Sequence, residues 1–489
     1  MQTGISRRCF LKSTTAGAVT CGFWSTLLER LIAATPQPPL GPGSKVRIGK
    51  IYLGHERPGW PAARVDLAAV IQRYETDLAK LAPQLRDVEF VDAGRPADAT
   101  QLAQARDKFR DVDGILVMHL TLGVGRQLES LMELGIPIVL FSLPYTGHEW
   151  HTIASWQRQG KLIEVYPTSR FEDVLIAIRP FRALRRLREA RILHVNFGPA
   201  DAAYCDAVRK KFGTEILNLG LPDLQRAYET ADQSEAMADC RRWIREADRV
   251  VEPTQEEILK ASRMFVAMRN LLAEHRAVLI TMNCLGMGLM DRGMAYPCLG
   301  FVRLNNMGLG GVCEADLKSS LTHLIFSYLV GRPGFVTDPV IDLATSTIIH
   351  AHCVAATQME GPDGPRARYI LRSHLEDDRG ASLQVRLPVG RKLTMARLIG
   401  TDIMLLATGD AVDSPLHEWG CRTKLTMKVQ NIEKFLDNWS SGLHRVVFYG
   451  DHSRDVRRFC RFARIRVLEE GVDDLHQVEG LEWRPHVHA

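Results

Sequence analysis

The sequence predicts an α/β protein that continues into a β-rich C-terminal domain. Up to about residue 330, short and fully apolar runs alternate with segments of helical period, which is typical of parallel sheets covered by helices on both faces. From about residue 335, short β-rich runs follow one another at close spacing, separated by Gly, Asp and Pro. That change in sequence pattern indicates a β-barrel or sandwich.

A chain of 489 residues is too long for one ordinary core, so several domains are expected. We expect a signal and linker at 1–43, an N-terminal α/β domain at 44–190, a second α/β domain at 191–334 and the β-rich domain at 335–489. Because clefts between domains commonly hold small-molecule sites, the boundary near residue 335 is of special interest.

The first domain opens with alternating apolar residues at 45–54, which predict a strand, and a helical pattern follows at 63–81. Two apolar runs rich in β-branched residues, at 112–120 and 136–145, flank a helix-period segment at 124–135. Strand, helix and strand in this order predict a Rossmann-like parallel sheet, whose carboxyl-end loops commonly contact ligands.

The second α/β domain repeats this pattern after a basic helix expected at 171–190. Strands are expected at 190–198, 214–220 and 277–286, with a helix at 200–212 after the first of them, so this domain is also predicted to be Rossmann-like. The later β-rich runs lie at 367–375, 381–390, 392–400, 402–410 and 424–430.

The N-terminus carries an export signal. Residues 6–12, Ser-Arg-Arg-Cys-Phe-Leu-Lys, match the twin-arginine pattern, and a mildly apolar stretch follows at 13–28. We therefore expect the twin-arginine export machinery as a partner and a periplasmic location, with the signal either cleaved or kept as an anchor. Residues 1–43 are excluded from the predicted fold.

Composition and charge are those of an ordinary globular protein. Hydrophobic residues make up 46% and charged residues 24% of the chain, and the formal net charge is only +5. Neither this charge nor any alternation of basic and aromatic residues points to nucleic acid. The ten cysteines form no CxxC pair and mostly sit in apolar runs, so buried free thiols are expected in place of a disulfide framework.

Two carboxylates and a histidine form the main candidate site. Glu314 lies in GGVCEADL and Asp338 in GFVTDP, while His444 lies in GLHRVVFYGDH immediately before an apolar strand. Carboxylates and an imidazole from separate segments can hold a divalent metal and leave coordination positions open. We expect Glu314 to project from a helix N-terminus, and Asp316 to be a first-turn helix residue.

A histidine pair leaves a second possibility open. His350 and His352 end an apolar run, and in a strand residues i and i+2 point to one face, so both imidazoles could address one metal. Such a pair is similar to the first two histidines in the metal-ligand set of zinc hydrolases. His374 is a further histidine candidate. The sequence contains no GxGxxG between a strand and a helix, no Walker pattern and no G-x-S-x-G elbow.

These segments together resemble the L-fucose isomerase family, with L-arabinose isomerase as a more distant relative. The likeness lies in DGILVMHLTLG, GIPIVLFSLPYTGHEW, ITMNCLG, AYPCLGF, CEADL, FVTDP, HAHC and GLHRVVFYGDH. Glu314 and Asp338 match the family's two carboxylate ligands in type and spacing, and His444 matches its C-terminal histidine ligand. The export signal and the shorter chain depart from the family's best-known members.

The resemblance implies a metal-dependent aldose–ketose isomerase that acts on a deoxy- or pentose-type monosaccharide through an enediol. It implies Mn²⁺ or another divalent cation held by Glu314, Asp338 and His444, with the two carboxylates as catalytic acid and base. It also implies a homo-oligomer, trimer or hexamer. The candidates for binding the sugar's other hydroxyls are His148, Glu149, His352, Trp419 and Arg422. The alternatives are a non-catalytic exported sugar-binding protein and a zinc hydrolase using His350 and His352.

Overall fold

The computed structural model describes residues 44–439, 442–478 and 481, so the expected signal at 1–43 lies outside the described residues. Tertiary contacts divide the chain into two compact units. Unit 2 spans 43–186 and 455–465, and unit 1 is the remainder. The segment 191–334 and the barrel region thus share unit 1, while a short C-terminal helical stretch belongs to unit 2.

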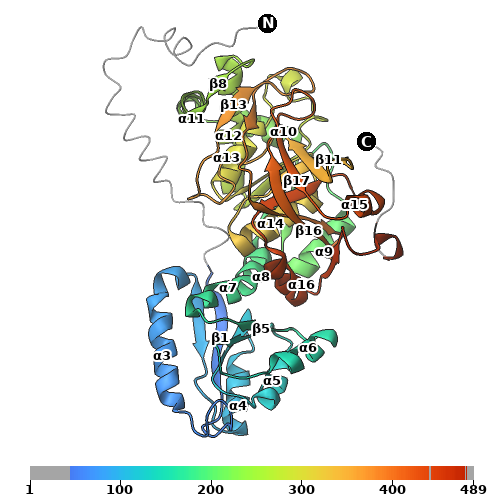
Figure 1. Ribbon diagram of the computed structural model, residues 1–489. Helices are drawn as coiled ribbons and strands as arrows, with labels where there is room; N and C mark the ends of the chain where they lie inside the picture. Colours follow the sequence, from blue (N-terminus) through green and yellow to red (C-terminus); the bar gives the residue numbers. More distant parts are fainter. Residues whose placement is uncertain (1–43, 440–441, 479–480, 482–489) are drawn as a thin grey trace. The chain divides into compact units, whose positions relative to one another are not determined.

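Unit 2 is built on a five-stranded parallel sheet with the order β2-β1-β3-β4-β5 (Figure 1). The central strands are buried on both faces, which explains their uninterrupted apolar sequences. The strand bounds are β1 Val46–Leu53, β2 Val88–Asp92, β3 Gly114–His119, β4 Ile138–Ser142 and β5 Ile163–Pro167.

Two separate apolar cores cover the faces of this sheet. Helix α3 packs in one core with side chains of β1, β3 and β4, and the helices α4, α5 and α6 pack in the other. Their bounds are α3 Leu67–Lys80, α4 Ala99–Lys108, α5 Gly125–Met132 and α6 Trp150–Arg158. The carboxyl ends of the parallel strands are therefore the edge where the loops of this unit can contact a ligand.

The single basic helix expected at 171–190 is wrong, because the structure divides it into a 3-10 turn and two helices. The turn spans Phe171–Asp173, α7 spans Val174–Ala177 and α8 spans Arg179–Glu189. Pro180 lies in the first turn of α8, where its fixed φ and missing N–H are tolerated, whereas inside one continuous helix it would remove a hydrogen bond.

Unit 1 contains a second parallel sheet, with the order β10-β9-β6-β7. Its strands are β6 Arg191–Val195, β7 Glu215–Leu219, β9 Leu279–Met282 and β10 Gly310–Cys313. Gly310 and Gly311 are required in β10, because a Cβ on them would overlap the Leu279 side chain and the Phe301 backbone respectively. These glycines let β10 lie between β9 and helix α13 (Cys298–Asn306), and so they set the position of the residue that follows Cys313.

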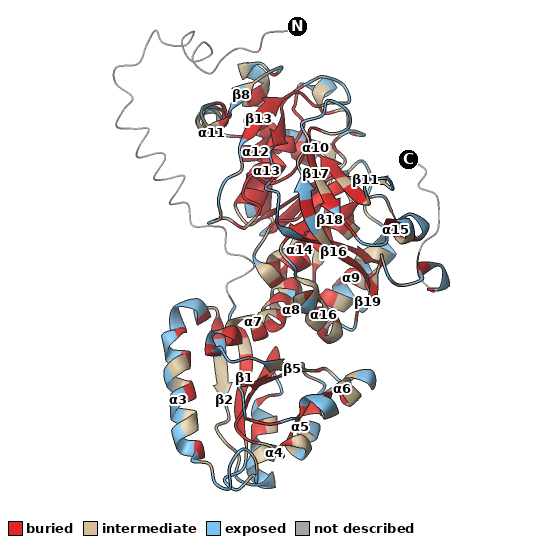
Figure 2. Ribbon diagram, viewed as in Figure 1, coloured by how far each residue is buried: buried red, intermediate tan, exposed pale blue. Residues whose placement is uncertain are grey.

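Six helices accompany this sheet. They are α9 Ala202–Phe212, α10 Leu221–Glu229, α11 Gln233–Glu246, α12 Gln255–Glu274, α13 Cys298–Asn306 and α14 Leu317–Val330. The last two before the barrel, α13 and α14, consist mainly of buried residues. Figure 2 colours the ribbon by this burial. No helix of the described residues is long and apolar enough to cross a membrane. The eight cysteines of this part of the chain are free thiols, and six of them are buried, as expected.

The C-terminal region forms a closed six-stranded antiparallel barrel, in the order β15-β18-β11-β12-β17-β16 with β16 pairing back to β15. Its strands are β11 Phe335–Asp342, β12 Thr347–His352, β15 Lys392–Ile399, β16 Ile403–Asp413, β17 Thr423–Lys428 and β18 Arg445–Tyr449. The α/β class and the barrel are thereby confirmed.

Four further strands and two helices complete the described elements, and most of the second helix, α16 (Ser453–Phe462), belongs to unit 2. Strand β19 pairs in parallel with β16 outside the closed barrel, and β8, β13 and β14 form a small sheet of their own. The runs expected at 367–375 and 381–390 are therefore strands, but not barrel strands. The bounds are β8 Arg249–Val250, β13 Tyr369–Arg372, β14 Ser382–Val385, β19 Arg466–Glu469, α15 Ile432–Asn438 and α16 Ser453–Phe462.

Candidate metal centre

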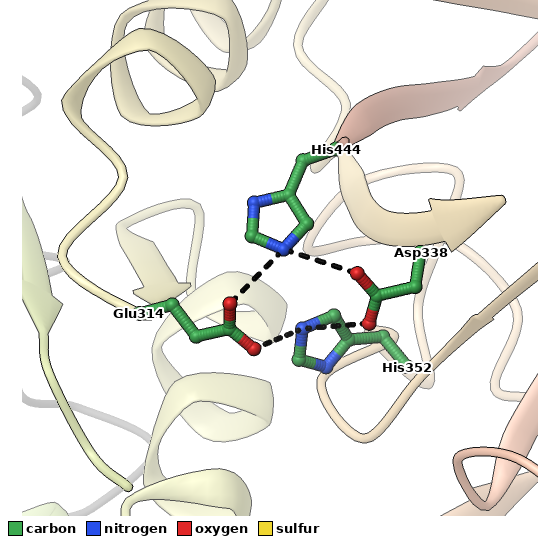
Figure 3. A group of neighbouring side chains, drawn as sticks. All are labelled: Glu314, Asp338, His352 and His444. Carbon is green, nitrogen blue, oxygen red and sulfur yellow. Dashed lines mark ion pairs between the residues drawn. The ribbon is translucent and has the colours of Figure 1, made fainter. Parts of the chain in front are cut away.

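Four side chains of unit 1 converge on one point: Glu314, Asp338, His352 and His444 (Figure 3). Each offers one oxygen or nitrogen atom, and these four atoms all lie within 4.8 Å of one another. The three residues predicted as metal ligands are thus brought together. His352, predicted to contact substrate, lies in the same group.

Glu314 reaches the site from the tight connection between β10 and α14. The expectation that it projects from a helix N-terminus is wrong, since α14 begins only at Leu317. Glu314 and Ala315 instead adopt left-handed backbone conformations, with φ of 62° and 54°. Such angles are uncommon for residues with a Cβ and are found where the surrounding structure enforces them, often at functional sites.

The other three side chains come from one end of the barrel. Asp338 lies in β11 opposite Ala351 of β12, one position before His352. On the other side of β11, Thr337 pairs with Arg445 of β18, which places His444 next to Asp338 across the two strands. The antiparallel register of three adjacent strands therefore brings these ligands together, although their spacing along the chain shows no obvious motif.

The imidazoles lie between the two carboxylates. His444 Nε2 is 3.3 Å from Glu314 Oε2 and 3.2 Å from Asp338 Oδ1, and His352 Nε2 is 3.6 Å and 3.8 Å from the other oxygens of the same carboxylates. Both histidines are buried, whereas the Glu314 and Asp338 side chains are 37% and 32% exposed. The group is thus rigid on its imidazole side and open to solvent on its carboxylate side.

Asp316 orients the ring of His444 through a hydrogen bond to the nitrogen that faces away from the metal-centre group. Its Oδ2 is 3.0 Å from His444 Nδ1 and also accepts a hydrogen bond from Arg397 Nη1 at 2.9 Å, while Oδ1 caps α14 by accepting from the backbone N–H groups of Lys318 and Ser319. Asp316 is the cap of α14, one position before its first turn. Because Nδ1–H donates to this carboxylate, Nε2 of His444 is the nitrogen that faces Glu314 and Asp338.

The charges of the group reinforce one another. Burial alone would raise the pKa of Asp316, but Arg397 and His444 hold it well below its usual range. Burial would lower the pKa of His444, yet Asp316, Asp338 and Glu314 raise it well above the usual value. The neighbouring imidazoles of His352 and His444 lower the pKa of Glu314. Positive charge beside Glu314 and Asp316, from Arg397, a protonated imidazole or a cation, therefore stabilises their ionised forms.

The neutral ring of His352 has the opposite tautomer to that of His444. Its Nδ1 accepts a hydrogen bond from the backbone N–H of Cys353 at 2.8 Å, so in the neutral ring the proton lies on Nε2. A proton on Nε2 suits a donor to a substrate oxygen better than a metal ligand. His350 does not join the group: it is fully buried, its Nδ1 lies 2.9 Å from Thr337 Oγ1, and burial and Arg445 lower its pKa to about 3.

These residues fit a divalent cation. The Nε2 atoms of His352 and His444 are buried with no hydrogen-bond partner, and both point into the group. Two carboxylates with one or two imidazoles form a mixed oxygen and nitrogen donor set of the kind that binds Mn²⁺, Fe²⁺ or Zn²⁺. The carboxylates' exposed side leaves room for further ligands from substrate or water.

None of the remaining predicted substrate residues is one of the four side chains of this group. Trp419 is 80% exposed, and Arg422 is buried, with its guanidinium committed to Ser373 and Glu418. His148 and Glu149 belong to unit 2. Sequence reasoning missed the role of Asp316, because its position before an apolar run signals a helix cap but not a contact with a histidine 128 residues away.

The chain matches no protein-family model, and no curated protein is significantly similar to it. The arrangement of the residues is therefore the basis for a functional assignment.

Proposed function

We propose that this protein is a metal-dependent aldose–ketose isomerase that acts on a deoxy- or pentose-type monosaccharide. The supporting observation is the convergence of Glu314, Asp338 and His444, with a buried fourth group, His352, beside them. An isomerase of this kind needs a cation site that is open on one side, together with two carboxylates that can exchange protons with adjacent carbons. The group meets both requirements.

Glu314, Asp338 and His444 would hold the cation, which we propose to be Mn²⁺. When bound, it supplies Lewis-acid polarisation of the sugar carbonyl. Asp316 keeps the ring of His444 oriented, and Arg397 keeps Asp316 ionised. A ligand so oriented loses less conformational freedom on binding, which is why such outer contacts commonly matter almost as much as the ligands.

The two carboxylates also move protons. One removes the proton from C2 while O1 is protonated, which gives an enediol, and a proton is then delivered to C1 as O2 loses its own, which gives the ketose. Glu314 and Asp338 lie on opposite sides of the imidazoles, as the two reacting faces require (Figure 3). The Nε2–H of His352 can donate to a substrate oxygen within this group.

Several further features are proposed with this function. The parallel sheets of both units would be Rossmann-like domains, and the chain would assemble as a homo-oligomer, trimer or hexamer. Twin-arginine export would place it in the periplasm. None of these features is needed for the test of the activity itself.

The test is ketose formation from L-fucose, L-arabinose and L-rhamnose, measured with chelator-treated protein before and after addition of Mn²⁺. We expect turnover of at least one aldose that depends on the added ion. Glu314→Gln and Asp338→Asn should each lower the rate by several orders of magnitude, because charge stabilisation and positioning are lost together. Asp342→Asn, at the last position of the same strand as Asp338 and outside the metal-centre group, is the matched control and should leave the rate unchanged.

Two results would contradict the proposal. Stoichiometric sugar binding without turnover would identify a binding protein. Tightly held zinc that is lost in His350→Ala would support a hydrolase, whereas a metal content insensitive to His350→Ala agrees with the observed burial of His350 outside the group.

A further inference from the structure

Unit 2 has a cavity of about 390 Å³, and none of the residues that line it belongs to the metal-centre group. It lies at the carboxyl ends of β4 and β5, where Ser142 ends one strand and Pro167 ends the next. Loops at this edge of a parallel sheet commonly form ligand sites, and a volume of this size suits a small molecule.

Aromatic side chains form the walls of this cavity. The ring of His148 lies 4.1 Å from that of Trp60 and 5.0 Å from that of Trp150, measured between centroids. Tyr145 is 76% exposed and has a left-handed backbone, with φ of 69°. A large aromatic residue in this conformation and in solvent is unfavourable in isolation, and such positions are concentrated at ligand-contacting loops.

The floor of the cavity is polar and connected to buried groups. Ser142 Oγ is 3.0 Å from His119 Nδ1, and His119 Nε2 is 3.2 Å from Glu149 Oε2. Both His119 and Glu149 are more than nine-tenths buried. Because Nε2 faces the Glu149 carboxylate, the proton of the neutral ring lies on Nε2 and Nδ1 accepts. The hydroxyl of Ser142 can donate to Nδ1, and the Thr146 hydroxyl, 3.2 Å from Nδ1 and 2.8 Å from Ser142 Oγ, belongs to the same network. The Ser142 oxygen can then accept a hydrogen bond from the cavity.

This arrangement is held rigidly. Glu149 Oε1 also accepts from the backbone N–H groups of Gly123 and Val124, at 2.8 Å and 3.3 Å. A Cβ at Gly147 would overlap the Glu149 carboxylate and the His119 ring, so the loop lies directly on the buried pair. The polar floor is therefore already in place before a ligand arrives, which reduces the cost of binding.

We propose that this cavity binds a neutral, hydroxyl-rich ring, that is, a monosaccharide. Among the described residues that line it there is no Lys, Arg, Asp or Glu, which disfavours phosphorylated or charged ligands. The aromatic wall offers faces for the apolar C–H side of a sugar, and the hydroxyls of Ser142, Thr168 and Ser169 offer partners for its polar edge. The proposal rests on unit 2 alone and does not depend on isomerase activity.

The test is saturation-transfer NMR on the full-length protein with L-fucose and L-arabinose as probes and adenosine as a flat-ring competitor. To silence the metal centre, the background protein carries Glu314→Gln and Asp338→Asn and is treated with a chelator. We expect saturation transfer to the sugar ring protons to persist in this background, with a dissociation constant in the millimolar range.

Two variants in this background locate the binding. Ser142→Ala removes one hydrogen bond and should weaken sugar binding by about 3–10-fold, and Trp150→Ala should weaken it by about tenfold. Phe197→Ala is the matched control, since it removes an exposed aromatic side chain of unit 1 that has no assigned role in binding, and it should have no effect. Near-ultraviolet circular dichroism verifies folding, and Ser142→Ala carries the test alone if Trp150→Ala does not fold.

Two kinds of outcome would overturn the proposal. Sugar signals that vanish in the silenced background, or that are insensitive to Ser142→Ala, would assign the binding to another site. Adenosine that binds more tightly than either sugar would identify a site for a flat base. Absence of isomerase activity in the wild-type protein, with sugar binding to the silenced protein intact, would contradict only the proposed function and leave the unit 2 site standing.

Discussion

Replacing Asp316 with Asn tests whether His444 is a metal ligand whose ring is oriented by the Asp316 carboxylate. The substitution keeps the size of the side chain and the capping oxygen for α14, since Asn and Asp are about equally good helix caps. It removes the charge that accepts from His444 Nδ1 at 3.0 Å and from Arg397 Nη1 at 2.9 Å. The amide nitrogen that replaces one oxygen cannot accept either bond.

The size of the effect follows from these contacts. A hydrogen bond to a charged group contributes about 1.5–3 kcal/mol, and loss of an outer partner of a ligating histidine typically weakens metal binding about 10–100-fold, or roughly 1.4–2.8 kcal/mol. The two ranges agree, so we expect the dissociation constant for Mn²⁺ to rise by about 10–100-fold in Asp316→Asn.

The assay is isothermal titration of chelator-stripped protein with Mn²⁺, which does not require turnover. Asp232→Asn is the control, because Asp232 caps α11 by accepting from Glu235 N at 2.8 Å and is not part of the metal-centre group. It should bind the ion like the wild type. A folded Asp316→Asn protein with unchanged affinity would refute the role of Asp316 and, with it, the assignment of His444.

Four further outcomes are expected. His350→Gln should leave Mn²⁺ affinity unchanged while lowering the melting temperature, because His350 is buried outside the group; loss of the ion would refute this. Chelation should lower the melting temperature, and excess Mn²⁺ should restore it. At an ion concentration a hundred times the dissociation constant, binding adds about 2.7 kcal/mol to the free energy of unfolding. In Glu149, burial opposes ionisation but His119 and Gly123 lower the pKa to about 2, from 4.5. The ionised Glu149 carboxylate thus stabilises the fold above pH 4.5, and this stabilisation is lost as the pH falls toward 2. Glu149→Gln should therefore lower the free energy of unfolding by about 2–3 kcal/mol at pH 7 and by progressively less in acid, as measured by urea unfolding. Arg445→Met should cost about 3–5 kcal/mol in the same assay, because it leaves the fully buried Glu470 unpaired, and a neutral result would contradict that view of the pair.

Local pattern predicted much of the fold. The apolar runs that became β1, β3 and β4 could be assigned as parallel strands because residues buried on both faces must be apolar throughout. The closely spaced β-rich runs after residue 335 likewise indicated a barrel or sandwich. Pattern did not show which strands closed the barrel, since β13 and β14 have the same texture yet pair with β8, a two-residue strand more than a hundred residues earlier.

The candidate site divides in the same way. Residue type and neighbouring strands were enough to single out Glu314, Asp338 and His444 as possible ligands, because few side chains can bind a hard cation. The sequence could not show that the register of β11 with β12 and β18 brings His352 and His444 to the same end of the barrel as Asp338.

By itself, then, the sequence determined which segments are buried and which residue types are available for chemistry, since both depend on local composition and period. Only the tertiary structure decided which of these groups meet: the contact of Asp316 with His444, the turn that aims Glu314, and the burial of His350 away from the group. The physical reason is that pairing between distant strands depends on side-chain packing across the whole core, which no short stretch of sequence contains.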